Sequence, residues 1–129
     1  KYNGMPGIYF VGHLVHGNDI TPENIDKIKS LGFDSVNVAG LFRGIRHFKP
    51  SLFDKFMRKI FNRPNVLKYS KVLPFLIMES DKKPYVLPTI TPCWDHTPRS
   101  GSGGDVLIDC TPELFKKNIF LKLSSVKKY

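Results

Sequence analysis

The feature that most constrains the fold is an apolar run, a capped amphipathic helix pattern and a second apolar run in direct succession. Residues 7–11 (Gly-Ile-Tyr-Phe-Val) are continuously apolar and rich in strand formers, which predicts a strand buried on both faces. Thr21-Pro22-Glu23 supplies a hydroxyl cap, a proline in the first turn and a carboxylate beside it. Gly32 then ends the helix, and residues 33–39 predict the next strand. This order predicts a βαβ unit with parallel strands.

A second helix pattern begins at Ser51 and has one wide apolar side. That side carries Leu52, Phe53, Phe56, Met57, Ile60 and Phe61, whereas Asp54, Lys55, Arg58 and Lys59 face the other way. We interpret this segment as an outer helix that packs its apolar side on an α/β domain. The alternative interpretation is a basic amphipathic helix that lies on a membrane surface.

The alternation continues to the end of the chain. Residues 67–78 predict a helix that Pro74 kinks or restarts, and residues 84–90 and 106–109 predict extended segments. Thr111-Pro112-Glu113 opens a last helix, whose inward side is predicted to carry Leu114, Phe115, Ile119 and Leu123. About four strands are too few to close a barrel of eight units, so a small doubly wound sheet and part of a barrel both remain open. No Gly-x-Gly-x-x-Gly or phosphate-loop pattern follows a strand, which argues against a nucleotide-binding sheet.

The charge balance is strongly basic, with 20 Lys and Arg against 11 Asp and Glu and a net charge of +9. These basic residues are scattered and accompany no nucleic-acid motif, so we expect a solvated basic surface and no nucleic-acid partner. The apolar run at residues 72–78 is too short to span a bilayer, so we expect no transmembrane segment. Cys93 and Cys110 fit neither a disulfide framework nor a zinc spacing, which favours free thiols, a cytoplasmic location and no structural metal.

Residues 88–99, followed by a glycine-rich loop, form the most unusual stretch of the chain. It contains the only Trp together with Asp95, His96 and Arg99, at the end of a predicted strand. Ligands of parallel α/β folds bind on loops at the carboxyl ends of strands. Trp94 offers a flat face for a sugar ring, while Asp95 and Arg99 can bond its hydroxyls. The alternative is that Trp94 fills a core and Asp95 caps a turn beside Arg99 as its ion partner.

Two further loops carry candidate groups. His13, His16 and Asp19 follow the first predicted strand, where they form either a weak metal-binding pattern, a substrate contact or an exposed polar loop. Arg43, together with Arg46 and His47, follows the second strand and would face the same rim. Glycosidic chemistry usually needs two carboxylates, and no pair is marked here by its spacing.

Residues 94–99 (Trp-Asp-His-Thr-Pro-Arg) and 111–115 (Thr-Pro-Glu-Leu-Phe) resemble two motifs of the WbsX-like glycosyltransferase family, also described as glycoside hydrolase family 99-like. Residues 3–6, 31–34 and 69–71 are similar to further stretches of that family, in the same order along the chain. His96 stands where the family has Asn, which argues against a role that needs an amide there. Met5 stands where the family has Lys.

The resemblance implies a partial (β/α)8 TIM-type barrel, with residues 1–129 as a single domain fragment of parallel strands alternating with helices. The family's amino-terminal half and its carboxyl-terminal Asn-Glu-Trp-x-Glu-Gly segment are expected outside this stretch. Catalytic acids are therefore expected beyond Tyr129. Substrate contacts are expected from Trp94, Asp95, His96, Arg99, His13 and Arg43.

The function that the resemblance implies is action on glycosidic bonds during assembly of a bacterial surface polysaccharide such as O-antigen lipopolysaccharide. The partner would be a carbohydrate, a sugar nucleotide or a lipid-linked sugar, and no cofactor is expected. The alternatives are a non-catalytic carbohydrate-binding remnant of the same barrel and a basic nucleic-acid-binding module. An enzyme and a binding remnant differ in whether a Glu-bearing strand end follows this chain.

Overall fold

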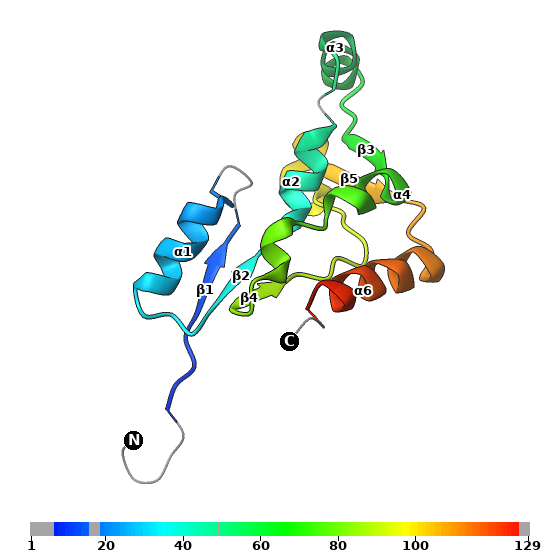
Figure 1. Ribbon diagram of the computed structural model, residues 1–129. Coiled ribbons are helices and arrows are strands. Elements are labelled where there is room, and N and C mark those ends of the chain that lie inside the picture. Colours follow the sequence, from blue (N-terminus) through cyan, green and yellow to red (C-terminus); the bar gives the residue numbers. More distant parts are fainter. Residues whose placement is uncertain (1–6, 16–18, 49, 127–129) are drawn as a thin grey trace.

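The computed structural model describes residues 7–15, 19–48 and 50–126, and it shows parallel strands alternating with helices (Figure 1). One sheet has the order β1-β2-β4, and a second pairs β3 with β5, all in parallel. The strands are β1 (Val11–Leu14), β2 (Ser35–Val38), β3 (Asn65–Lys68), β4 (Val86–Pro88) and β5 (Asp105–Ile108). The predicted α/β class with parallel strands is therefore confirmed.

The helices lie between and around these strands. They are α1 (Pro22–Ser30), α2 (Gly40–His47), α3 (Leu52–Ile60), α4 (Tyr69–Val72), α5 (Thr97–Ser100) and α6 (Pro112–Val126), with 3-10 helices η1 (Leu73–Phe75), η2 (Glu79–Lys82) and η3 (Gly101–Gly103). α1 connects the neighbouring strands β1 and β2, as a βαβ unit requires. Its cap is the predicted one, because the Thr21 hydroxyl accepts a hydrogen bond from the Asn24 amide at 3.2 Å.

The first strand differs from its prediction in position and in burial. β1 begins at Val11, and the side chains of Ile8, Tyr9 and Phe10 are exposed by 79%, 64% and 54%. The prediction of a strand buried on both faces at residues 7–11 is therefore wrong. α1 covers this strand only from Gly12 onward, where the helix approaches closely, so the apolar residues before it have no covering layer. β2 is the strand that is mostly buried on both faces, with Val36 and Val38 fully inaccessible.

Two apolar clusters form the core. One gathers Val36, Val38 and Val86 of the larger sheet with Ile25 of α1 and Met78. The other is formed by Leu41, Ile45, Tyr69, Val72, Leu73, Leu76 and Leu107, from α2, α4, η1 and β5. Gly40 and Gly44 allow α2 to approach the segment around Leu76, because a Cβ on Gly40 would lie 2.8 Å from the Leu76 carbonyl oxygen.

Polar side chains connect α6 to this core. Asn118 and Lys122 are one helical turn apart and are both almost fully buried. Lys122 Nζ lies 2.6 Å from Asp81 Oδ2 and also donates to the Leu76 carbonyl at 2.6 Å. The prediction that α6 turns an apolar side inward is wrong at Leu123, which is 47% exposed, whereas Leu114 packs against a core cluster.

Three helical segments differ from the sequence prediction. Residues 67–78 begin as the end of β3, continue as α4 and pass into η1 at Leu73, so only their middle is helical. Arg43, Arg46 and His47 lie on α2, where the sequence predicted a loop. α3 begins after Ser51, as predicted, and Ser51 forms a capping box with Asp54. None of the residues of α3 is buried, and the helix projects from one end of the molecule (Figure 1). The prediction that its apolar side packs on the domain is therefore wrong.

Candidate functional site

A cavity of about 570 Å³ opens at the carboxyl ends of three parallel strands. It lies where β1, β2 and β4 give way to the segments that follow them, the position at which parallel α/β folds bind ligands. The lining residues are His13, Val15, Asn37, Ala39, Leu41, Phe42, Thr89, Ile90, Thr91, Pro92, Cys93 and Trp94. A mostly apolar wall with a few polar groups is typical of a small-molecule site.

The polar groups of the cavity are positioned by the strand ends themselves. Asn37 of β2 donates from Nδ2 to the Leu87 carbonyl at 2.9 Å and to Thr89 Oγ1 at 3.3 Å. The Thr89 hydroxyl in turn donates to the Val38 carbonyl at 2.9 Å. These bonds across β2 and β4 hold an amide and a hydroxyl in fixed orientations beside the cavity. His13 of β1 is exposed beside them.

The Trp94 side of the cavity is held on β5. The Trp94 carbonyl accepts from the Leu107 amide at 2.8 Å, and the His96 amide donates to the Asp105 carbonyl at 3.0 Å. Asp95 thus forms an antiparallel bridge with Val106. The indole ring has Phe42 at its edge, 5.9 Å between ring centroids, and His96 stacked on it at 5.8 Å. Its half-buried position leaves ring surface in the cavity wall.

A buried hydrogen-bond network fixes the segment between Thr89 and Trp94. The Thr91 carbonyl accepts from the Tyr69 hydroxyl at 2.5 Å and from Asn118 Nδ2 at 3.0 Å. Asn118 Nδ2 also donates to the Tyr69 hydroxyl at 2.9 Å. Burial raises the pKa of the Tyr69 phenol, which therefore stays a neutral donor. The cavity wall is consequently anchored to α4 and α6.

Of the substrate-binding residues expected from the sequence, the structure brings His13 and Trp94 into one cavity. His96 lies next to Trp94 and does not line the cavity; its Nδ1 is 3.3 Å from the Ser100 hydroxyl. Arg99 is exposed on α5. Arg43, on α2, lines a separate hollow of about 150 Å³ together with His47, whose ring stacks on Phe75.

Asp95 serves the turn that starts α5. Its Oδ1 accepts hydrogen bonds from the Thr97 amide at 2.8 Å and from the Thr97 hydroxyl at 2.7 Å. These two donors hold the pKa of the Asp95 carboxyl below its usual range. In this geometry the motif at residues 94–99 forms a rigid turn, in which Trp94 is the member that reaches the cavity.

The remaining candidate ligands do not form a metal site within the described part of the chain. His16 lies outside the described residues, and Asp19 is exposed at the approach to α1. No group of three or more His, Cys, Asp or Glu side chains that could hold a metal ion occurs among the residues described. The cavity lining likewise contains no carboxylate from these residues.

Sequence reasoning missed Asn37, Thr89 and Phe42. Asn37 had a usable signal, since a lone amide between Val36 and Val38 near the end of an apolar strand is placed at the ligand-binding edge. Thr89 is two residues past Leu87 in an extended segment and had no distinguishing spacing. Phe42 lies on α2, a helix that the sequence did not predict.

The whole chain, residues 1–129, matches the family model described as glycosyltransferase WbsX. The chain belongs to this family. No curated protein and no solved structure matches it. Membership places this WbsX-family chain among carbohydrate-active proteins of the glycosyltransferase class, and it confirms the resemblance seen in the motifs at residues 94–99 and 111–115.

The two cysteines of this WbsX-family chain lie on either side of the same carbonyl group. Cys93 Sγ donates to the Leu107 carbonyl at 3.3 Å, and Cys110 Sγ donates to it at 3.6 Å. Burial and the neighbouring Cys93 raise the pKa of the Cys110 thiol to about 12. Cys110 is therefore expected to stay protonated at neutral pH, whereas Cys93 is exposed at the cavity.

None of the described helices is long and apolar enough to cross a membrane. The two helices that support the cavity wall, α2 and α6, are 8 and 15 residues long. In this WbsX-family chain they serve to position the cavity wall, through Phe42 and Asn118.

Proposed function

We propose that this chain forms the sugar-binding rim of a glycosyltransferase that acts in assembly of a bacterial surface polysaccharide such as O-antigen. The observation that carries the proposal is the cavity at the ends of β1, β2 and β4, with Trp94 in its wall, in a member of the WbsX family. A sugar ring packs its apolar face on the indole, while fixed amide and hydroxyl groups bond its hydroxyls. Asn37 and Thr89 supply those polar groups.

The same proposal includes the barrel and the location. Parallel pairing of β1 with β2, which α1 connects, and of β2 with β4 is compatible with part of a (β/α)8 barrel. We therefore propose that residues 1–129 are part of such a barrel, in a cytoplasmic enzyme whose substrate is a sugar nucleotide or a lipid-linked sugar. No cofactor is required by this proposal.

The reaction needs groups that the cavity does not contain. Glycosyl transfer and hydrolysis both use carboxylates as acid, base or nucleophile, and the cavity lining among the described residues has none. We propose that the catalytic acids come from outside residues 1–129. In this proposal Trp94, Asn37 and His13 bind the sugar, and carboxylates from outside residues 1–129 transfer protons.

The test is a calorimetric titration of the chain with a panel of sugar nucleotides and free monosaccharides. The variants are Trp94→Ala and His13→Ala, with Phe61→Ala, directly after α3 and away from the cavity, as an aromatic control. We expect each cavity variant to weaken binding of the sugar that the wild type prefers by about tenfold, or ~1.4 kcal/mol. Because His13 is exposed, His13→Ala should fold normally and still tests the cavity if Trp94→Ala fails to fold.

Unchanged affinity in both cavity variants would refute the assignment of this cavity. Binding without transfer in the longer protein would favour the alternative, a carbohydrate-binding domain without catalysis. This alternative is retained because the described residues that line the cavity include no carboxylate. A transfer assay on the longer protein, using the sugar nucleotide identified by calorimetry, separates the two.

A further inference from the structure

The outer side of α3 exposes more large apolar surface than a solvated helix normally carries. Leu52, Phe53, Phe56 and Ile60 are exposed by 84%, 69%, 60% and 57%, and no residue of α3 is buried. Isolated exposed apolar side chains are common, but a contiguous set on one helix indicates a surface that is covered by something else.

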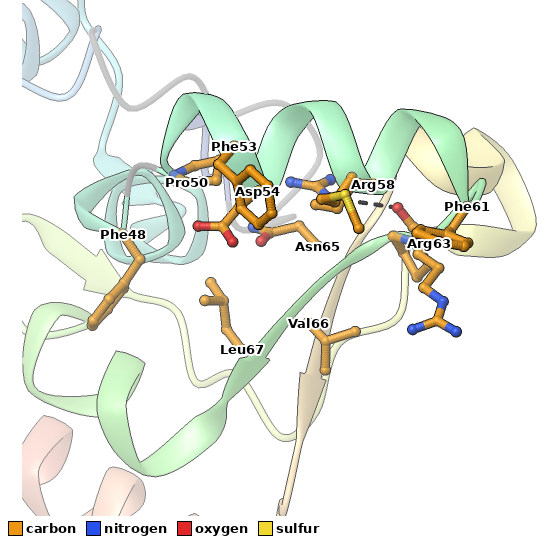
Figure 2. Close-up of a pocket in the computed structure, with 12 residues that line it drawn as sticks. Phe48, Pro50, Phe53, Asp54, Arg58, Phe61, Arg63, Asn65, Val66 and Leu67 are labelled. Carbon is orange, nitrogen blue, oxygen red and sulfur yellow. Dashed lines mark hydrogen bonds between the residues drawn. The ribbon is translucent and has the colours of Figure 1, made fainter.

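The contact of α3 with the body of the protein does not account for these exposed apolar side chains. A hollow of about 720 Å³ separates α3 from β3, and Phe53 of α3 and Phe61 at its end border it (Figure 2). Met57 also lines this hollow. Val66 and Leu67 of β3 lie across the hollow from them (Figure 2). The lining does not include Leu52, Phe56 or Ile60, which therefore lie on the helix surface away from the body of the protein.

The remaining side of α3 is cationic. Lys55 and Lys59 lie on it and are exposed, beside a shallow hollow against Ser102 and Gly103. Arg58 and Arg63 instead line the hollow between α3 and β3. The helix contains one carboxylate, Asp54, whose Oδ2 is bound to the Ser51 hydroxyl at 2.6 Å in the capping box. Asp54 is therefore occupied in starting the helix, and Lys55 and Lys59 leave this exposed side of α3 positively charged.

We propose that α3 binds the chain to an anionic lipid bilayer, lying in the plane of the interface with Leu52, Phe56 and Ile60 inserted. An apolar side bearing Phe and Leu, next to a side of Lys and Arg, is the composition of helices that lie on membranes. Lys and Arg stems reach past the apolar boundary so that their charges contact lipid phosphates. α3 projects from the end of the molecule, so the body of the protein does not obstruct a flat surface there (Figure 1).

Charge and size favour a bilayer over a second copy of this chain. Two copies would bring together like-charged α3 helices on chains that each carry a net charge of +9. A nine-residue helix is about 14 Å long, which is too short to supply the ~800 Å² per partner of a stable protein interface. An anionic bilayer instead offers opposite charge and an apolar interior. This inference is independent of the sugar site and requires that the rest of the proposed barrel leaves the outer side of α3 uncovered.

The experiment is flotation of the 129-residue chain in a density gradient with vesicles of equal parts phosphatidylcholine and phosphatidylglycerol, and with vesicles of phosphatidylcholine alone. Only lipid-bound chain floats, so aggregated chain is not counted as bound. We expect binding to the anionic vesicles, weakening as salt is added, and little binding to the neutral ones. The double variant Leu52→Ser/Phe56→Ser should reduce the partition constant by at least about tenfold, because both inserted side chains are lost. Lys55→Gln/Lys59→Gln should reduce it by about tenfold as well.

Matched control variants distinguish an effect of α3 from an effect of total charge or total apolar surface. Leu31→Ser/Phe120→Ser removes two apolar side chains that are exposed elsewhere, and Lys27→Gln/Lys117→Gln removes two exposed charges on α1 and α6. Both controls should bind as the wild type does. A Phe56→Trp variant adds a direct readout that needs no destabilising change: its emission, after subtraction of the wild-type Trp94 signal, should shift to the blue on anionic vesicles.

Three results would overturn the proposal. The first is no flotation of the wild type with anionic vesicles at low salt. The second is an equal loss of binding in the α3 and control charge variants, which would show attraction by net charge alone. The third is self-association in light scattering that Leu52→Ser/Phe56→Ser abolishes while vesicle binding is absent, which would assign the surface to a protein partner.

Discussion

Lys122 and Asp81 form an ion pair that is almost completely removed from water. Their side chains are 2% and 0% exposed, and Asp81 Oδ2 also accepts from the Met78 amide at 3.0 Å. The second oxygen of Asp81 is buried with no partner among the described residues. Such a pair contributes little as a unit, because desolvation offsets the attraction, but it penalises removal of either member heavily.

Replacing Lys122 with Met should therefore lower the free energy of unfolding by about 3–5 kcal/mol, because the Asp81 carboxylate would remain buried without its cation. Urea denaturation followed by circular dichroism measures this loss. The control is Lys82→Met, which breaks an exposed ion pair with Glu79 and should cost less than about 1 kcal/mol. Losses of similar size in the two variants would show that Lys122 is not buried as described.

The Cys110 thiol provides a second prediction at this scale. Because its pKa is raised from 9.0 to about 12, the thiolate is scarce at pH 8 in the folded chain. Iodoacetamide should label Cys110 at least about a hundredfold more slowly in the native chain than in urea, with Cys93 as the internal comparison, read by mass spectrometry.

The same pKa difference links stability to pH. A raised pKa in the folded state gives a stabilising contribution that is complete below the unfolded value of 9.0 and is lost as the pH rises toward about 12. Cys110→Ala should remove this alkaline loss from the stability profile. Rapid native labelling of Cys110, or an unchanged alkaline slope in Cys110→Ala, would contradict the assigned burial.

Secondary elements with strong local start signals were predictable, and short elements were not. α1, α3 and α6 begin at a hydroxyl cap, and α1 and α6 have proline in the first turn. β3 and α2 lacked such signals. A four-residue strand such as β3 can be assigned only from its pairing with β5, which the local sequence does not reveal. The burial of Asn118 and Lys122 was also unpredictable, since their partners are far away along the chain.

Contact between β1 and α1 depends on Gly12. A Cβ at this position would lie 2.3 Å from Ile28 Cγ2, so the helix would have to move away from the strand. Gly12→Ala should cost about 1–3 kcal/mol of stability in urea denaturation. Gly7→Ala is the matched control, because nothing lies within 4 Å of its added Cβ. Adding Ile28→Ala to Gly12→Ala should recover part of the loss, and failure to recover any would contradict this contact.

At the scale of the whole molecule, the site is assembled from three strand ends and a loop. The sequence predicted Trp94 and His13 because each stands out in a segment that follows a strand. Their meeting in one cavity depends on the order β1-β2-β4, which local patterns do not specify. The role of Asp95 was unpredictable from local sequence, because a carboxylate in such a loop can accept hydrogen bonds within a turn or bind a ligand equally well.

The molecule exposes apolar side chains on several elements at once. Val66 of β3, Leu87 of β4 and Ile108 of β5 are exposed by 49%, 42% and 39%, in addition to the surface of α3. We expect the isolated chain to aggregate with rising concentration and to unfold over a broad temperature range. Calorimetry and light scattering measure both. A sharp cooperative transition from a monomeric sample would contradict this expectation.

The central claim is that a sugar binds against Trp94, and its most direct test is the emission of that residue, the only tryptophan in the chain. The chain is titrated with sugar nucleotides and with free monosaccharides while the emission is recorded. The account predicts a saturable change with at least one sugar, weakened in His13→Ala and unaffected in Phe61→Ala. No change across the panel, or a change that His13→Ala leaves intact and Phe61→Ala removes, would contradict it.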